Sequence, residues 1–114
     1  PDAAAVGVAL AAARQGESPS GVPTLLLVTT PGCDPCERAR HDLRFLVRPE
    51  DLGAHAHVLS TADATAGTEA LGVLVTPAYV LVDEEDRFVA MTRGYRGPVE
   101  LRAWLREALG VDPP

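Results

Sequence analysis

Residues 24–47 read TLLLVTTPGCDPCERARHDLRFLV, and this stretch decides the fold. Its first part, Thr24 to Thr29, is a continuous aliphatic and β-branched run between Pro23 and the pair Pro31-Gly32. Such a run is typical of a strand buried on both faces in a largely parallel sheet. We therefore expect a central strand here.

An amphipathic helix is predicted directly after this strand, from Cys33 through Val47. Its apolar residues recur at three- and four-residue spacing, which places them on one helical face. The apolar positions are Cys36, Ala39, Leu43, Leu46 and Val47, and the charged residues Arg38, Arg40, Asp42 and Arg44 lie elsewhere. The strand thus runs into a helix that begins at two cysteines.

The remaining segments complete an α/β domain. Before the central strand we expect a helix over Ala3 to Arg14 and a connector to residue 22. After the cysteine helix we expect a strand over Ala54 to Leu59 and a short helix or turn region over Thr61 to Leu71, ending near Gly72. An antiparallel hairpin of Ala78 to Val82 and Phe88 to Thr92, with a solvated acidic turn, precedes a last helix from Pro98, whose buried stripe is Leu101, Trp104, Leu105, Ala108 and Leu109. This order predicts a central mixed sheet of about four strands with helices on both faces. We expect a single domain over 1–114, with its core in residues 23–110.

Composition excludes several classes of function. The 114 residues are 46% hydrophobic and 23% charged, as in an ordinary folded domain. The net charge of -6 disfavours binding to nucleic acid or anionic lipid, and no apolar run is long enough to cross a bilayer. Because the chain begins at Pro1 without Met, a signal peptide, an anchor or another domain can have preceded it.

Cys33 and Cys36 are the only cysteines, and two cysteines at a strand-to-helix junction indicate chemistry rather than a disulfide framework. Cys33 lies at the positive end of the helix dipole, which stabilises its thiolate. Cys36 falls on the same face of the first turn, so it can close a disulfide with Cys33 or resolve a mixed disulfide formed there. Pro35 suits a first turn, where its missing N–H costs nothing. We expect Cys33 to be the exposed nucleophile and Cys36 the shielded resolving thiol.

Other interpretations of the pair stay open, among them a passive structural disulfide. A zinc site needs about four ligands, and only His41, His55 and His57 could add to the two thiolates. His55 and His57 share one face of a strand that we expect at the sheet edge, where a pair of histidines is unsurprising. A copper(I)-binding module would suit soft thiolates, and a redox-sensing interaction domain would be oxidised without turnover.

Two motifs together resemble the thioredoxin superfamily. One is the segment from Leu25 through Cys33-Asp34-Pro35-Cys36 to Leu46, and the other is VTPAYVLVD over Val75 to Asp83. The resemblance covers roughly Pro23 to Leu109 and is nearest to small bacterial thioredoxin-like thiol-disulfide oxidoreductases. It implies an enzyme that exchanges disulfides with protein substrates through the redox core of residues 23–110 and receives electrons from a redox donor protein or a membrane electron carrier. It also implies an extracytoplasmic location, periplasmic or membrane-anchored, with the cytoplasm as the open alternative. We expect a monomer that needs no cofactor, because the electrons pass through the cysteines themselves.

The resemblance also implies a substrate-binding site beside the cysteines. Pro77 would be a cis-proline facing the pair, and the backbone of Thr76 would pair with an extended substrate segment, much as in strand addition. The plainer alternative is a trans-proline that starts an edge strand. Gly94 matches the family glycine that keeps the groove open, and Tyr95 falls beside this groove, either as a substrate contact or as an ordinary loop aromatic.

Three departures from the family pattern affect the chemistry. Pro31-Gly32 stands where cytoplasmic thioredoxins carry a tryptophan, which alters the docking surface. Leu27 stands at the position of the buried aspartate that helps deprotonate the resolving cysteine, so that task falls to water or a nearby carboxylate. Asp34 and Glu37 place negative charge beside Cys33, which disfavours its thiolate and makes the dithiol a better reductant. We therefore expect a reductase.

Overall fold

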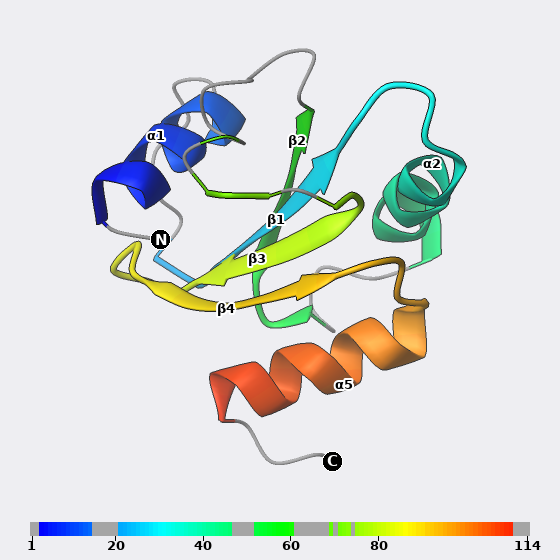
Figure 1. Ribbon diagram of the computed structural model, residues 1–114. Coiled ribbons are helices and arrows are strands. Elements are labelled where there is room, and N and C mark those ends of the chain that lie inside the picture. Colours follow the sequence, from blue (N-terminus) through cyan, green and yellow to red (C-terminus); the bar gives the residue numbers. More distant parts are fainter. Residues whose placement is uncertain are drawn as a thin grey trace.

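The computed structural model describes residues 3–14, 21–46, 52–60, 69, 71–73 and 75–110, with the backbone alone described over residues 55–60. Its elements are α1 (Ala3–Arg14), β1 (Thr24–Thr29), α2 (Asp34–His41), the π-helical segment η1 (Asp42–Leu46), β2 (His55–Ser60), β3 (Ala78–Val82), β4 (Phe88–Arg93) and α5 (Pro98–Leu109), as Figure 1 shows. Residues 15–20 of the predicted connector and most of the predicted region 61–71 lie outside the described residues. Within the described ranges, no helix combines the length and apolar character needed to cross a membrane.

The four strands form one mixed sheet in the order β2-β1-β3-β4. β1 runs parallel to β2 and antiparallel to β3, and β3 runs antiparallel to β4. All six residues of β1 are buried, so the predicted central strand is confirmed. The expectation of a largely parallel sheet is wrong, because a continuous apolar run reports burial on both faces and carries no information on the direction of the neighbouring strands.

Helices cover both faces of the sheet, because successive strand residues point to opposite sides. On one face, Leu26 and Val28 of β1 pack with Val6 and Leu10 of α1. On the other face, a second core forms around β1, β3, α2 and α5, and its fully buried members include Leu25, Leu27, Ala39, Tyr79, Leu81, Leu101 and Leu105. Figure 1 shows α1 apart from α2 and α5, with the sheet between them. The predicted two-faced arrangement is confirmed.

The helix after the cysteines differs from the prediction. It is α-helical only to His41 and continues as the wider η1, so residues beyond that point leave the positions that an α-helical wheel assigns them. Asp42, predicted on the polar side, is 4% exposed, whereas Leu46, predicted to be buried, is 56% exposed. Tyr95 supplies the reason for the first change, since its hydroxyl donates a hydrogen bond to the Asp42 carboxylate.

The hairpin turn between β3 and β4 is tied to α1. Asp83 Oδ1 accepts the backbone N–H groups of Glu85 and Arg87, both at 2.9 Å, which shapes the turn. Arg14 at the end of α1 donates to both carboxylate oxygens of Asp86, at 2.9 and 2.8 Å. This hydrogen bonding lowers the pKa of Asp86 below its ordinary value. The acidic turn is confirmed, but one of its four acids holds a helix in place.

Candidate active site

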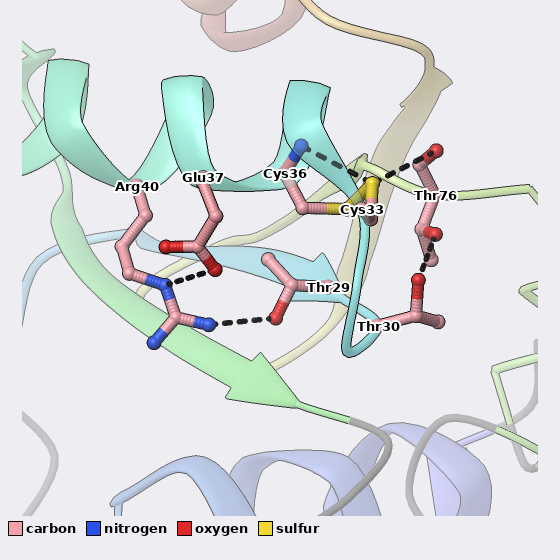
Figure 2. Close-up of a disulfide and its surroundings, with 7 residues drawn as sticks. All are labelled: Thr29, Thr30, Cys33, Cys36, Glu37, Arg40 and Thr76. Carbon is pink, nitrogen blue, oxygen red and sulfur yellow. Dashed lines mark hydrogen bonds and ion pairs between the residues drawn. A yellow bond between two sulfur atoms is a disulfide. The ribbon is translucent and has the colours of Figure 1, made fainter.

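The two cysteines form a disulfide at the start of α2, with their Cα atoms 5.2 Å apart (Figure 2). Cys33 is the N-cap residue, in an extended conformation, and its Sγ accepts the backbone N–H of Cys36 at 3.2 Å. Asp34 and Pro35 are exposed in the first turn. Cys33 is half-buried and Cys36 is fully buried, so an approaching thiol or disulfide meets Cys33 first.

The loop before β3 faces this disulfide. The carbonyl oxygen of Thr76 lies 4.0 Å from Cys33 Sγ, and the Thr76-Pro77 peptide bond is cis. The hydroxyls of Thr76 and Thr30 are hydrogen bonded at 2.8 Å, which joins the loop to the end of β1. The carbonyl of Pro77 accepts the N–H of Gly94 at 2.7 Å, and Gly94 has φ +91°, a conformation that suits glycine. The structure thus brings Cys33, Thr76, Pro77 and Gly94 together.

Tyr95 has a hydrogen-bond partner that the sequence pattern did not reveal. Its hydroxyl donates to Asp42, and this hydrogen bond to the carboxylate raises the pKa of Tyr95 to about 12. The guanidinium of Arg38 lies over the Tyr95 ring, 5.4 Å from its centroid. No helical periodicity could have found Asp42, because its inward position depends on the π-helical widening of η1 and on a tyrosine 53 residues away.

Comparison with known proteins rests on structure alone. No protein-family model matches the chain, and no curated protein matches it in sequence. Among solved structures, a thioredoxin-fold protein from Helicobacter pylori superposes with a TM-score of 0.69 at 18% identity, over 84% of this chain and 77% of that one. Trxlp from Edwardsiella tarda superposes with a TM-score of 0.63 at 20% identity, over 92% of this chain and 93% of that one. Thioredoxin f2 from Chlamydomonas reinhardtii superposes with a TM-score of 0.69 at 17% identity, over 87% of this chain and 90% of that one.

The chain has the thioredoxin fold. The fold predicted from the two motifs is therefore confirmed across most of the chain, and the disulfide occupies the strand-to-helix junction that the prediction named.

Within this thioredoxin fold, Leu27 is fully buried in the core beneath α2, so an apolar side chain fills the position where the resemblance placed an aspartate. A different polar group lies further along the helix that begins at the disulfide. Arg40 lies one helical turn after Cys36, and its Nη2 donates to Thr29 Oγ1 at 3.1 Å while its Nε lies 3.8 Å from Glu37 Oε1 (Figure 2). The helical pattern predicts Arg40 on the charged side of the helix, although its four-residue spacing from Cys36 is the signal that places the two residues side by side.

The alternative metal site gains no further ligands in the described part of the fold. Over those residues, no group of three or more histidine, cysteine, aspartate or glutamate side chains is arranged to hold a metal ion. His41 contacts Phe45, with ring centroids 5.1 Å apart, and the side chains of His55 and His57 lie outside the described residues. The chemistry available at the described site is that of the two sulfurs.

Proposed function

We propose that the chain is a thiol-disulfide oxidoreductase that acts on protein substrates. One observation carries this proposal: a half-buried sulfur caps a helix N-terminus, 4.0 Å from the carbonyl of a loop residue. The amide N–H groups of the first helical turn stabilise a thiolate on Cys33 once the disulfide is reduced. The Thr76 carbonyl is placed to accept a backbone N–H from an extended substrate segment.

In the direction of substrate reduction, the Cys33 thiolate attacks one sulfur of a substrate disulfide. A mixed disulfide forms, and the substrate's other sulfur leaves as a thiolate that takes a proton from water. The Cys36 thiolate then attacks Cys33 Sγ, which releases the second substrate thiol and restores the Cys33–Cys36 disulfide. The substrate gains two electrons and two protons. A redox donor protein or a membrane electron carrier then returns two electrons to the pair, and the two protons come from the donor or from water.

We propose the reductase direction because of the charges around Cys33. Asp34 and Glu37 lie in the first turn of α2, and both are exposed. Their carboxylates oppose the helix dipole at the sulfur, so they raise the free energy of the thiolate. A dithiol whose thiolate is less stabilised gives up its electrons more readily.

Turnover of a disulfide-bonded model protein, with dithiothreitol as electron source, tests this function. The wild-type chain should reduce many equivalents of substrate. In a separate reaction, Cys36→Ser is reduced, freed of dithiothreitol and mixed with the substrate; it should react once and accumulate a mixed disulfide visible as a covalent adduct by mass spectrometry, whereas Cys33→Ser should form no adduct. Oxidation without turnover would support the redox-sensing alternative instead, and a pair that binds copper(I) and forms no disulfide would support the metal-binding one.

Equilibration with glutathione or dithiothreitol buffers gives the reduction potential of the Cys33–Cys36 pair, which shows whether the pair donates electrons to its substrate or accepts them. A reduction potential near about -270 mV or lower is expected of a reductant. A value near about -120 mV would assign the pair to disulfide donation and contradict the role given to Asp34.

A further inference from the structure

The outer side of α2 and η1 carries a hollow of about 200 Å³ lined by Glu37, Arg40, His41, Arg44 and Phe45. We propose that this hollow binds an acidic side chain of the protein substrate, next to the reactive disulfide. This inference rests on the proposed function, because the disulfide exchange brings the substrate to the hollow.

Two arginines provide the chemistry. Arg40 is held from behind by Thr29, which is fully buried, so its guanidinium has a fixed place on the wall. Its buried Nε–H has no hydrogen-bond acceptor, since Glu37 reaches it only at 3.8 Å. Arg44 is exposed and makes neither an ion pair nor a hydrogen bond with any described residue. A carboxylate entering the hollow would meet one anchored and one uncommitted guanidinium, and this geometry favours charge-assisted hydrogen bonds.

The walls of the hollow favour a peptide over a free inorganic anion. Phe45 is 68% exposed and stacks at a tilt on His41, and the next residue, Leu46, is 56% exposed. An inorganic anion gains nothing from such apolar surface, whereas the methylene groups beside a glutamate or aspartate pack on it. Two arginines and one carboxylate, that of Glu37, line the hollow, so it is locally positive on a chain whose net charge is -6. This local charge complements an acidic side chain.

The position of the hollow sets the spacing of the acidic residue. Figure 2 shows Thr76 on one side of the disulfide and Glu37 with Arg40 on the other. An α-helix rises about 1.5 Å per residue, so Arg40 lies about 6 Å along α2 from Cys36, and Arg44 lies about one turn further along, in η1. An extended segment advances about 3.3 Å per residue. A substrate acid about two to four positions from the reacting cysteine therefore reaches the hollow.

Paired peptides test the inference. Each carries one cysteine as a mixed disulfide with thionitrobenzoate, and a glutamate or a glutamine three positions away. The reduced chain attacks the peptide sulfur, forms the peptide disulfide with Cys33 and releases thionitrobenzoate, whose absorbance gives the second-order rate constant. The glutamate peptide should react about three- to tenfold faster than the glutamine peptide at low salt, and this ratio should fall in 0.5 M salt as the charges are screened.

The variant Arg44→Gln should bring the ratio close to one, because it removes the uncommitted guanidinium from an exposed position that has no structural partner. Arg106→Gln on α5 makes the same change of charge away from the hollow and should keep the wild-type ratio. Equal rates for both peptides in the wild-type chain, or the same loss of ratio in both variants, would overturn the inference while leaving the exchange reaction intact.

A binding measurement separates this inference from the proposed function. Titration of a cysteine-free glutamate peptide into the oxidised chain should shift the NMR signals of Phe45 and the Arg44 side chain, and the glutamine peptide should not. If neither thionitrobenzoate peptide reacts but these shifts appear, the hollow stands and the exchange function fails. If inorganic phosphate produces the shifts and the glutamate peptide does not, the hollow takes free anions only and the inference fails.

Discussion

At the residue scale, the charge of Asp34 bears directly on the redox chemistry. Asp34 follows Cys33 and is exposed in the first turn of α2, where a carboxylate benefits from the helix dipole but repels a neighbouring thiolate. The interaction of Asp34 with the helix dipole stabilises the folded chain, whereas its repulsion of the Cys33 thiolate destabilises the reduced pair. A less stable reduced pair is a stronger reductant.

Asp34→Asn should raise the reduction potential, because it removes the repulsion and stabilises the thiolate. The rise should be on the order of 10 to 30 mV, since about 30 mV corresponds to a tenfold change in a two-electron equilibrium. Equilibration against glutathione, with free thiols counted by mass spectrometry, measures it. Glu100→Gln, in the first turn of α5, is the matched control and should leave the potential unchanged. An unchanged or lower potential in the Asp34→Asn variant would remove the argument for a reductase.

The bond from Tyr95 to Asp42 should appear in the pH dependence of stability. Tyr95→Phe leaves a buried carboxylate without its donor, so the free energy of unfolding at pH 7 should fall by about 1 to 3 kcal/mol. The raised pKa of Tyr95, about 12 against 10.0, means that the native state keeps this proton when the unfolded chain has lost it. The stabilisation is complete below pH 10 and is lost as the pH rises toward 12, so the difference between wild type and variant should shrink over that range.

Urea denaturation at pH 7, 9 and 11 measures this difference. Tyr79→Phe is the matched comparison, because the Tyr79 hydroxyl makes only a 3.4 Å hydrogen bond to the carbonyl of Arg96. Its loss at pH 7 should be smaller than that of Tyr95→Phe. An equal loss in the two variants would show that Asp42 gains nothing special from Tyr95.

At the scale of elements, an ion pair between Arg14 and Asp86 fastens α1 to the β3–β4 turn. Asp86 adopts φ +63°, and asparagine also tolerates this left-handed conformation, so Asp86→Asn removes the charge without a backbone change. The free energy of unfolding at pH 7 should fall by about 1 kcal/mol in Asp86→Asn, as for the loss of a well-formed, partly buried ion pair.

The lowered pKa of Asp86 gives the pH dependence its sign. The native carboxyl stays ionised at a pH where the unfolded one is protonated, so the stabilisation is present above pH 3.8 and is lost as the pH falls below it. The gap between wild type and Asp86→Asn should therefore be wide at pH 7 and narrow at pH 2. Glu85→Gln, in the same turn, pairs only with the exposed Arg87 and should change stability little at either pH. A gap that stays constant with pH would contradict the role of the pair.

Some elements of this fold can be predicted from the sequence, and others cannot. β1, the β3–β4 hairpin and α5 follow from local patterns, because apolar runs, turn acids and the 3.6-residue period each report on their own segment. β2 begins one residue later than predicted, which is the ordinary uncertainty of a strand boundary. The cysteines were predicted from their spacing, and the Thr76-Pro77 segment beside them from family resemblance. Asp42 and the hollow were not, since Arg40, Arg44 and Phe45 look like any solvated helix face until η1 and Thr29 fix where they point.

At the scale of the whole molecule, β1 belongs to both cores. Leu26 faces α1 and Leu27 faces α2 and α5, and both are fully buried. Neither face can lose its packing without disturbing the strand that supports the other. The described domain should therefore unfold as one unit.

Leu26→Ala should lower the free energy of unfolding by about 2 to 5 kcal/mol, as large-to-small core substitutions do. Trp104 packs against the opposite core, so its fluorescence reports on the face that this substitution does not touch. The fluorescence transition and the far-ultraviolet circular dichroism transition should shift together in urea. In Leu27→Ala, on the other face of the sheet, the fluorescence and circular dichroism transitions should also shift together. A shift of the dichroism transition without the fluorescence transition would mean that the two faces fold separately.

The order of the strands in the sheet has a consequence for the synthesis of the chain. β1 is entirely buried, yet β3, its antiparallel partner, lies some fifty residues later, at Ala78–Val82. When β1 leaves the ribosome, only about a quarter of the described fold has been made. The aliphatic side chains of β1 then stay exposed, and β1 stays unpaired with β3, while the following residues are translated. β2, the other neighbour of β1, also follows it in the chain, so a chaperone that shields residues 24–29 during this interval should lower aggregation of the nascent chain.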